Sequence, residues 1–141
     1  MKEKIKNMEL NIMCCVLLRP ELMDEIEIED REFKNYKRLW KFLKTFYNKF
    51  KNFDIELMTT VCNDKYQIIE YVQMILERQA STVNFKKYQQ ALLDLNHKNK
   101  LDIYFADKMY EYIFELSVGN ISIDDFVDKV NELYEKVQTL K

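Results

Sequence analysis

The fold class is decided by residues 85–118, FKKYQQALLDLNHKNKLDIYFADKMYEYIFELSV, which contain neither proline nor glycine. Apolar side chains recur in this stretch at three- and four-residue intervals, the spacing that one face of an α-helix shows. At 1.5 Å per residue, about 34 residues form a helix about 50 Å long. Gly119 follows directly, where helices commonly end in a left-handed residue. We therefore expect one long helix that ends at a tight turn.

The residues after Gly119 predict a second helix. Ser122 and Asp125 have the spacing of a capping box, with Asp in place of Glu or Gln. Apolar residues then recur at heptad-like intervals: Phe126, Val130, Leu133, Val137 and Leu140. Because only residues 119–121 separate the two helices, we expect an antiparallel helical hairpin over residues 83–141.

The residues before the hairpin predict a compact helical head over 1–82. Apolar periodicity indicates helices near 4–18, 21–28, 36–50 and 65–79, and Asp54 is placed to cap a short further one, about five in all. Pro20 falls in the first turn of the second helix, where proline is tolerated. The sequence thus predicts an all-α chain of one domain, with a head at 1–82 and a hairpin at 83–141.

Glycine and proline are scarce, with one of each where average usage gives roughly ten and seven. A P-loop needs two glycines around a lysine and a Rossmann turn needs three, so neither nucleotide-binding motif can occur. Sheet folds that depend on glycine-rich hairpins are equally disfavoured. Nucleotide hydrolysis on those scaffolds is excluded.

The number and spacing of the cysteines bear on the cellular location and on metal binding. The three cysteines are an odd number, two of them adjacent, which predicts a reducing, cytoplasmic location. Cys14, Cys15, Cys62 and His97 lack the paired spacing of zinc ligands, so we expect no metal and no cofactor. The apolar run 12–18 is too short for a signal peptide or a membrane span.

The acidic runs at 21–30 and 124–128 lie among polar neighbours, whereas a catalytic carboxylate needs burial to shift its pKa. His97 stands beside Lys98 and Lys100 and is interpreted as a solvated residue. We therefore expect no catalytic residues and no enzyme activity.

The helix near 36–50 combines an aromatic stripe with lysines. Residues 30–52 hold eight Lys or Arg and two acids, a local net charge of +6. Helical spacing sends the rings to one face and most cations to the other, which favours a core helix with a solvated basic face. The alternative is a weak contact with DNA or an acidic protein through the basic face of 34–51, centred on Lys37, Lys41 and Lys44.

The long helix is apolar around nearly its whole circumference between Ile103 and Phe114. The second helix of the hairpin can cover only one side, so either the head or another chain covers the rest. We favour self-association. The residues expected to take part are Ile103, Tyr104, Tyr110, Phe114, Val127 and Tyr134.

The N-terminal segment resembles the opening of the N-terminal collar domain of DnaB-type replicative helicases: Glu9-x-x-Ile12-x-x-x-x-Leu17-Leu18-x-Pro20-Glu21-Leu22-Met23-Asp24-Glu25-Ile26. Further matches follow in order along the chain: Phe33, Leu39-Trp40, Leu43, Tyr47, Phe53-Asp54-Ile55, Thr82-Val83-Asn84 and Tyr88. The resemblance covers essentially the whole sequence, although each motif is short.

The resemblance implies a helical head followed by a hairpin that pairs with a second copy in a ring collar, and contacts to primase and helicase-loader proteins. The chain departs from the family in two places. The segment after Phe33 lacks the family's Tyr-x-Pro, and residues 96–100 are only partly basic. It also ends where the linker to the ATPase domain would begin. We expect either a domain of a longer helicase or a free-standing, phage-type modulator of a helicase or its loader. A small nucleic-acid-binding protein is the alternative of another class.

Overall fold

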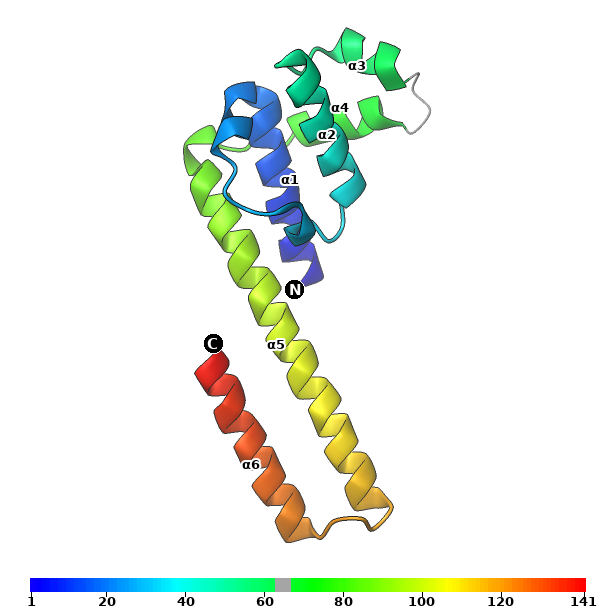
Figure 1. The fold of residues 1–141 in the computed structure, drawn as a ribbon, viewed down its shortest axis with the longest axis vertical. Helices are drawn as coiled ribbons and strands as arrows, with labels where there is room; N and C mark the ends of the chain where they lie inside the picture. Colours follow the sequence, from blue (N-terminus) through cyan, green and yellow to red (C-terminus); the bar gives the residue numbers. More distant parts are fainter. Residues whose placement is uncertain (63–66) are drawn as a thin grey trace. The chain divides into compact units, whose positions relative to one another are not determined.

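The computed structural model describes residues 1–62 and 67–141, and its regular structure is helical (Figure 1). The α-helices are α1 (Lys2–Leu18), α2 (Lys37–Phe50), α3 (Ile55–Cys62), α4 (Ile68–Leu76), α5 (Phe85–Ser117) and α6 (Ile123–Leu140). Short 3₁₀ helices occupy Pro20–Glu25, Asp30–Glu32 and Thr82–Asn84. No strand occurs in the described residues, so the all-α prediction is confirmed.

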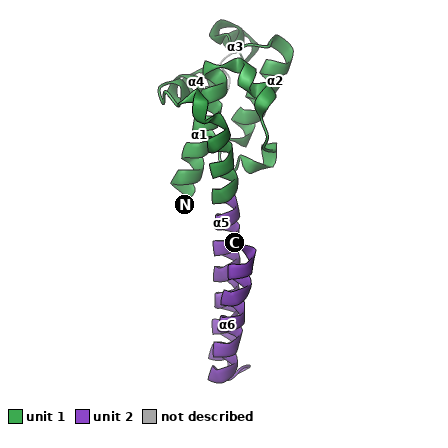
Figure 2. Ribbon diagram, turned by 90° about the vertical axis from the view of Figure 1, so that its left-hand side faces the viewer, with its two compact units in different colours: residues 1–95 green, residues 96–141 purple. Residues whose placement is uncertain are grey.

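The chain groups into two compact units, Met1–Leu95 (unit 1) and Asn96–Lys141 (unit 2) (Figure 2). Helix α5 belongs to both, because it continues without a break from Phe85 to Ser117. None of the described helices is both long and apolar enough to cross a membrane.

Helix α1 lies at the centre of unit 1. Residues 12–16, the run IMCCV, have no exposed surface at all. Five consecutive residues reach around the whole circumference of a helix, so this part of α1 is enclosed on every side. It contacts α4 and the 3₁₀ helices Pro20–Glu25 and Thr82–Asn84.

Helix α2 contributes the aromatic part of the same core. Trp40 is fully buried and stacks on Phe33, with ring centroids 4.4 Å apart and planes 9° from parallel. Phe46 lies against Phe50 and Phe53. The prediction that the aromatic stripe of this helix faces the core is confirmed.

Three predicted helix ends are confirmed by their local geometry. Asp54 Oδ1 accepts the backbone N–H of Leu57 at 2.9 Å, which caps α3. Ser122 and Asp125 form the reciprocal capping box of α6, with Ser122 Oγ accepting the Asp125 N–H at 3.0 Å. Gly119 has φ +80°, the left-handed conformation expected after α5.

The prediction of a helix at 21–28 was wrong in type and length. The segment is a 3₁₀ helix that ends at Glu25, and Ile26 is extended. A long-range contact explains the early end, because the backbone N–H of Glu27 donates to Gln89 Oε1 of α5 at 2.7 Å instead of to a helical carbonyl. The adjacent Ile28 is buried by this extended course.

The helix expected at 65–79 is α4, which begins at Ile68 and ends at Leu76. The expected start lies outside the described residues. At the other end Gln79 is left-handed, with φ +51°, so the chain turns there and Ala80 donates its N–H to Cys14 Sγ of α1 at 3.4 Å.

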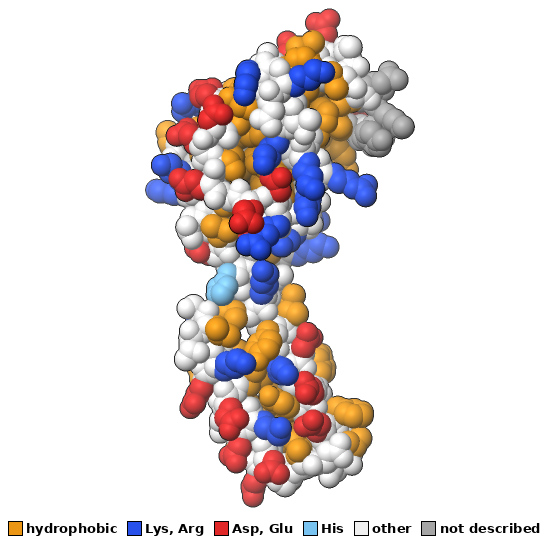
Figure 3. All heavy atoms as spheres, in the orientation of Figure 1, with side chains coloured by type: hydrophobic (Ala, Val, Ile, Leu, Met, Phe, Trp, Pro, Cys, Tyr) orange, Lys and Arg blue, Asp and Glu red, His pale blue; other side chains and the backbone are white. Residues whose placement is uncertain are grey.

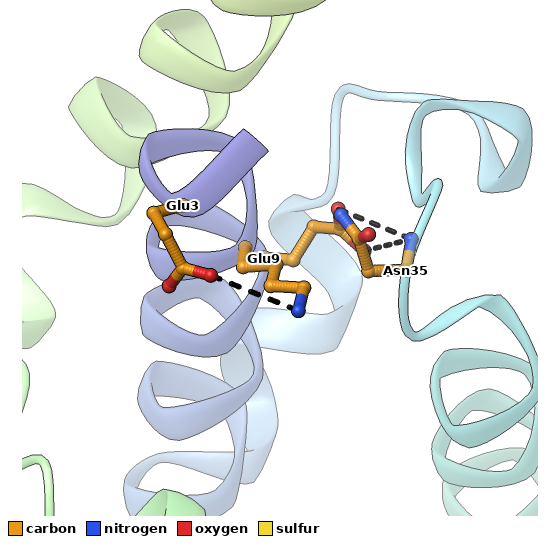
Figure 4. A network of polar contacts seen from close by, with 4 residues as sticks. Glu3, Glu9 and Asn35 are labelled. Atoms are coloured by element: carbon orange, nitrogen blue, oxygen red, sulfur yellow. Dashed lines mark hydrogen bonds and ion pairs between the residues drawn. The ribbon is translucent and has the colours of Figure 1, made fainter. Parts of the chain in front are cut away.

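A buried carboxylate joins α1 to the start of α2 (Figure 4). Glu9 is fully buried, and its Oε1 accepts the backbone N–H groups of Asn35 and Tyr36, both at 3.0 Å. The Asn35 side chain donates to Oε2 at 2.8 Å. The carboxylate therefore lies at the N-terminus of α2, where the helix dipole favours a negative charge.

In unit 2 the second half of α5 and α6 lie side by side and antiparallel. Lys136 Nζ lies 5.4 Å from the ring centroid of Tyr104, and Lys129 Nζ lies 5.3 Å from that of Tyr112. His97 Nε2 lies 2.8 Å from the carbonyl oxygen of Leu140. As the residue number rises along α5, that of its partner falls along α6, which defines an antiparallel pair.

Candidate interaction surfaces

The residues predicted to self-associate lie on both helices of unit 2. Five of them are exposed: Ile103, Tyr110, Phe114, Val127 and Tyr134. Tyr110 and Phe114 are the most open of the five, with 74% and 65% of their surface accessible. The sixth, Tyr104, is half-buried and packs against Lys136 of α6.

On α5 the exposed residues share one side, here called the α5 stripe, which consists of Ile103, Tyr110, Ile113 and Phe114. At 100° per residue, Ile103, Tyr110 and Phe114 point within about 40° of one another. Tyr104 and Tyr112, which contact α6, are turned from Ile103 by about 100° or more. The α5 stripe is thus directed away from α6.

Helix α6 carries a second exposed row. Leu133 is its one buried residue among those described, and it marks the side that faces α5. Ile123, Val127 and Tyr134 are exposed and lie about 100° around the helix from Leu133. In Figure 3 orange hydrophobic side chains are accordingly visible along unit 2, interspersed with Asp and Glu.

The predicted basic face of α2 divides into two parts. Lys44 Nζ donates to Asp30 Oδ1 at 2.8 Å, and Trp40 Nε1 donates to the same oxygen at 2.9 Å. The Lys44 hydrogen bond is the largest cause that holds the pKa of Asp30 below its usual value, and the charge of Lys41 acts in the same direction. Lys44 is therefore paired within unit 1, whereas Lys37 and Lys41 are exposed and form no ion pair with a described residue.

Lys37 lines a groove of about 910 Å³ in unit 1, here called the α2–α4 groove. Lys34 and Arg38 line it too, so three cations lie along it. Its apolar lining comes from Leu39 and Phe42 of α2 and from Ile68 and Tyr71 of α4. Figure 3 shows Lys and Arg side chains on unit 1 in blue, among red acidic and orange hydrophobic ones.

The side chains considered for metal binding or catalysis lie apart. No three His, Cys, Asp or Glu side chains of the described residues are grouped so that they could hold a metal ion. Cys14 and Cys15 are buried, and burial raises the pKa of Cys15 to about 12, so its thiol stays protonated. His97 is exposed as expected, but it also holds the end of α6 through the Leu140 carbonyl.

Two features of these surfaces have a weak signal or none in the sequence. Glu9 lies four residues from Ile5 and four from Met13, on the apolar side of α1, and a carboxylate at such a position signals a buried polar contact. The α2–α4 groove has no such signal, because its two sides come from segments about thirty residues apart that only tertiary packing brings together.

Comparisons with protein families, with characterised proteins and with solved structures gave no match to this chain.

Proposed function

We propose that this chain is a non-catalytic, cytoplasmic DNA-replication module of the helicase N-terminal type. In this proposal it self-associates through the α5–α6 pair and docks a replisome protein: a primase, a helicase loader or a helicase. The head-and-hairpin arrangement of that helicase domain belongs to the proposal, with unit 1 containing the head and the α5–α6 pair as the hairpin.

The observation that carries self-association is the α5 stripe. An exposed apolar row along a helix, on the side opposite its intramolecular partner, is typical of a surface that another chain covers. Its members repeat at helical spacing, and Ile103 and Tyr110 are seven residues apart, as in helices that pack side by side.

A second copy is the occupant that the stripe fits best. Along the same side, Ala106 lies between Ile103 and Tyr110, so a small side chain alternates with large ones. In an antiparallel pair of α5 helices the Tyr110 ring of each copy can lie over Ala106 of the other. Such a contact is self-complementary, as a twofold symmetric interface requires.

The link to replication rests on the ordered sequence resemblance to the DnaB-type collar domain, from Glu9 to Tyr88. Two forms of the proposal are compatible with that resemblance. The chain is part of a longer helicase, or it is a free-standing, phage-type modulator or inhibitor that occupies the binding site of a helicase or a loader. Reading the natural gene beyond the codon of Lys141 distinguishes them, since a helicase continues into a glycine-rich P-loop.

A nucleic-acid-binding protein is the second candidate, and the cations Lys34, Lys37 and Arg38 favour it. Binding to phosphates weakens steeply between about 50 and 200 mM salt because counterions are released. Association through the α5 stripe is apolar and should change little over that range. Sedimentation and oligonucleotide binding across this salt range therefore separate the two candidates.

Self-association is tested by analytical ultracentrifugation of the wild type and of a Tyr110→Asp/Phe114→Asp variant. The wild type should sediment as a dimer or larger species at micromolar concentration, and the variant as a monomer, because two carboxylates in an apolar contact are not solvated. Val83→Asp is the matched control, since Val83 is an exposed apolar residue of unit 1 outside the stripe. A wild type that is monomeric at high micromolar concentration contradicts the proposal, as does a variant that keeps the wild-type mass. Turnover of ATP contradicts the non-catalytic part.

A further inference from the structure

The α2–α4 groove combines an apolar lining with cations that have no ion-pair partner among the described residues. Lys34, Lys37 and Arg38 are exposed, and none of them forms an ion pair with a described residue. Lys44, one turn and a half further along α2, is in contrast paired with Asp30 at 2.8 Å. Three cations of the basic face that form no ion pair with a described residue thus lie together along the groove.

The apolar part of the lining comes from α2, from Tyr36 just before it, and from α4. Leu39 and Phe42 follow the cations on α2 and are half-buried, and Ile68 and Tyr71 of α4 complete the lining. Tyr71 keeps 44% of its surface exposed beside this lining. A volume of about 910 Å³ is large enough to receive several apolar side chains of a ligand.

This lining fits a peptide better than a nucleic acid. A single-stranded nucleic acid needs a track of aromatic faces along a continuous cationic surface. The groove has rings at Tyr36, Phe42 and Tyr71, but the aliphatic side chains of Leu39 and Ile68 also line it and offer no stacking face, so its lining is mixed and not a track of rings. Unit 1 as a whole has 16 Lys or Arg against 15 Asp or Glu, a net charge of only +1, so no broad field attracts a phosphate backbone.

We propose that the α2–α4 groove binds an acidic amphipathic helix of a partner protein. Apolar side chains at positions i, i+3, i+4 and i+7 of that helix would enter the groove against Leu39, Phe42 and Ile68. Carboxylates beside them would pair with Lys34, Lys37 and Arg38, which gives the contact its orientation and its selectivity against basic partners. This inference rests on the proposed function, in that it gives the docking of a replisome protein a place and a chemistry.

The test is fluorescence anisotropy of the full chain with a labelled synthetic peptide of about 15 residues, long enough to form a helix. The peptide carries Leu at i, i+3, i+4 and i+7 and Glu at the flanking positions. It should bind saturably at micromolar concentration. A peptide with the same leucines and Lys in place of Glu should not bind.

Three variants locate the contact. Lys37→Glu/Arg38→Glu should weaken binding by about tenfold or more, because it replaces attraction by repulsion. Tyr71→Ser should weaken it several-fold without changing the charge, as expected only if apolar contacts contribute. Lys87→Glu is the control, because Lys87 is an exposed lysine of unit 1 that does not line the groove, and it should leave the affinity unchanged.

Three outcomes would overturn the inference. The acidic peptide does not bind, or it binds equally to the Lys37→Glu/Arg38→Glu variant, or an oligo(dT) strand binds more tightly than the peptide and is lost in the same variant. The last outcome would make the groove a nucleic-acid site. The Tyr110→Asp/Phe114→Asp variant should bind the peptide with the affinity of the wild type. The experiment therefore distinguishes an error in the self-association proposal from an error in the peptide-binding proposal.

Discussion

The carboxylate of Glu9 in α1 accepts the backbone N–H of Tyr36 at 3.0 Å, one residue before α2 begins. The oxygen that accepts it also accepts the N–H of Asn35, and the second oxygen is held by the Asn35 amide. A charged side chain on one helix thus supplies the acceptors that the start of another helix lacks.

Glu9→Gln should lower the free energy of unfolding by about 1–3 kcal/mol, because the new amide group has one acceptor fewer and brings N–H donors toward buried N–H groups. Urea denaturation followed by circular dichroism measures it. Glu3→Gln is the matched control on the same helix. Glu3 is exposed and its 3.8 Å contact with Lys6 is a surface ion pair, so its change should stay within about 0.5 kcal/mol. Equal effects of the two substitutions would contradict the role given to Glu9.

Asp30 makes the free energy of unfolding of unit 1 depend on pH in the acidic range. Hydrogen bonds from Lys44 and Trp40 lower the pKa of Asp30 in the folded chain, so folding favours the ionised carboxylate. The contribution of Asp30 to stability is therefore complete above the pKa that Asp30 has in the unfolded chain. It disappears as pH falls through the lower pKa that Asp30 has in the folded chain. Fluorescence of Trp40, the single tryptophan, should report unfolding at progressively lower urea as pH falls below about 4, the usual pKa of an Asp side chain in an unfolded chain.

Asp30→Asn should remove that part of the pH dependence and cost about 1 kcal/mol at neutral pH, the value of a partly solvated charged hydrogen bond. Glu29→Gln serves as its control, because Glu29 pairs with Arg31 at 2.8 Å and both side chains are largely exposed. The interpretation fails if Asp30→Asn retains the wild-type loss of stability in acid.

The three thiols should differ in reactivity. Cys14 and Cys15 are buried and the pKa of Cys15 is raised to about 12, whereas Cys62 is half-buried. Iodoacetamide at pH 8, followed by mass spectrometry, should modify Cys62 first in the native chain and all three thiols in urea. A native Cys62→Ser variant should react only slowly. Rapid double modification of that variant would show that α1 is not enclosed as described.

Gly119→Ala should destabilise the α5–α6 pair by about 1–2 kcal/mol, the cost of a left-handed conformation for a residue with a Cβ atom. No atom lies within 4 Å of the position that the Cβ would take, so the conformation alone carries the cost. Gly119→Asn should cost less, because Asn tolerates φ near +80° better than Ala does. Thermal unfolding of the two variants by circular dichroism compares them. A Gly119→Asn variant less stable than Gly119→Ala would contradict this account.

Features that depend on neighbouring residues could be predicted from the sequence. The caps at Asp54 and Ser122 and the turn at Gly119 involve residues at most three positions apart, and the structure has all of them. The burial of the aromatic side of α2 could be predicted in the same way, because the whole pattern lies within one helix.

Features set by distant residues could not be predicted. The extended course after Glu25 depends on Gln89, which is 62 residues from Glu27. On α5, both Tyr104 and Tyr110 satisfy the apolar pattern, and only the position of α6 separates a packed ring from an open one. The pairing of Lys44 with Asp30 likewise distinguishes it from Lys37, although both belong to one basic helix.

The single buried residue described in α6, Leu133, has a consequence for the lifetime of the chain. An 18-residue helix with one buried side chain, besides the half-buried Phe126, Val130 and Val137, gains less from its own chain than α1 does, so it opens more easily unless something else covers it. Proteases cleave open segments, and their rate follows the open population. When the chain is present in excess of the binding partner of α6, proteolysis should therefore begin in this helix and leave α1 intact. The concentration of that partner would then determine how much full-length protein remains.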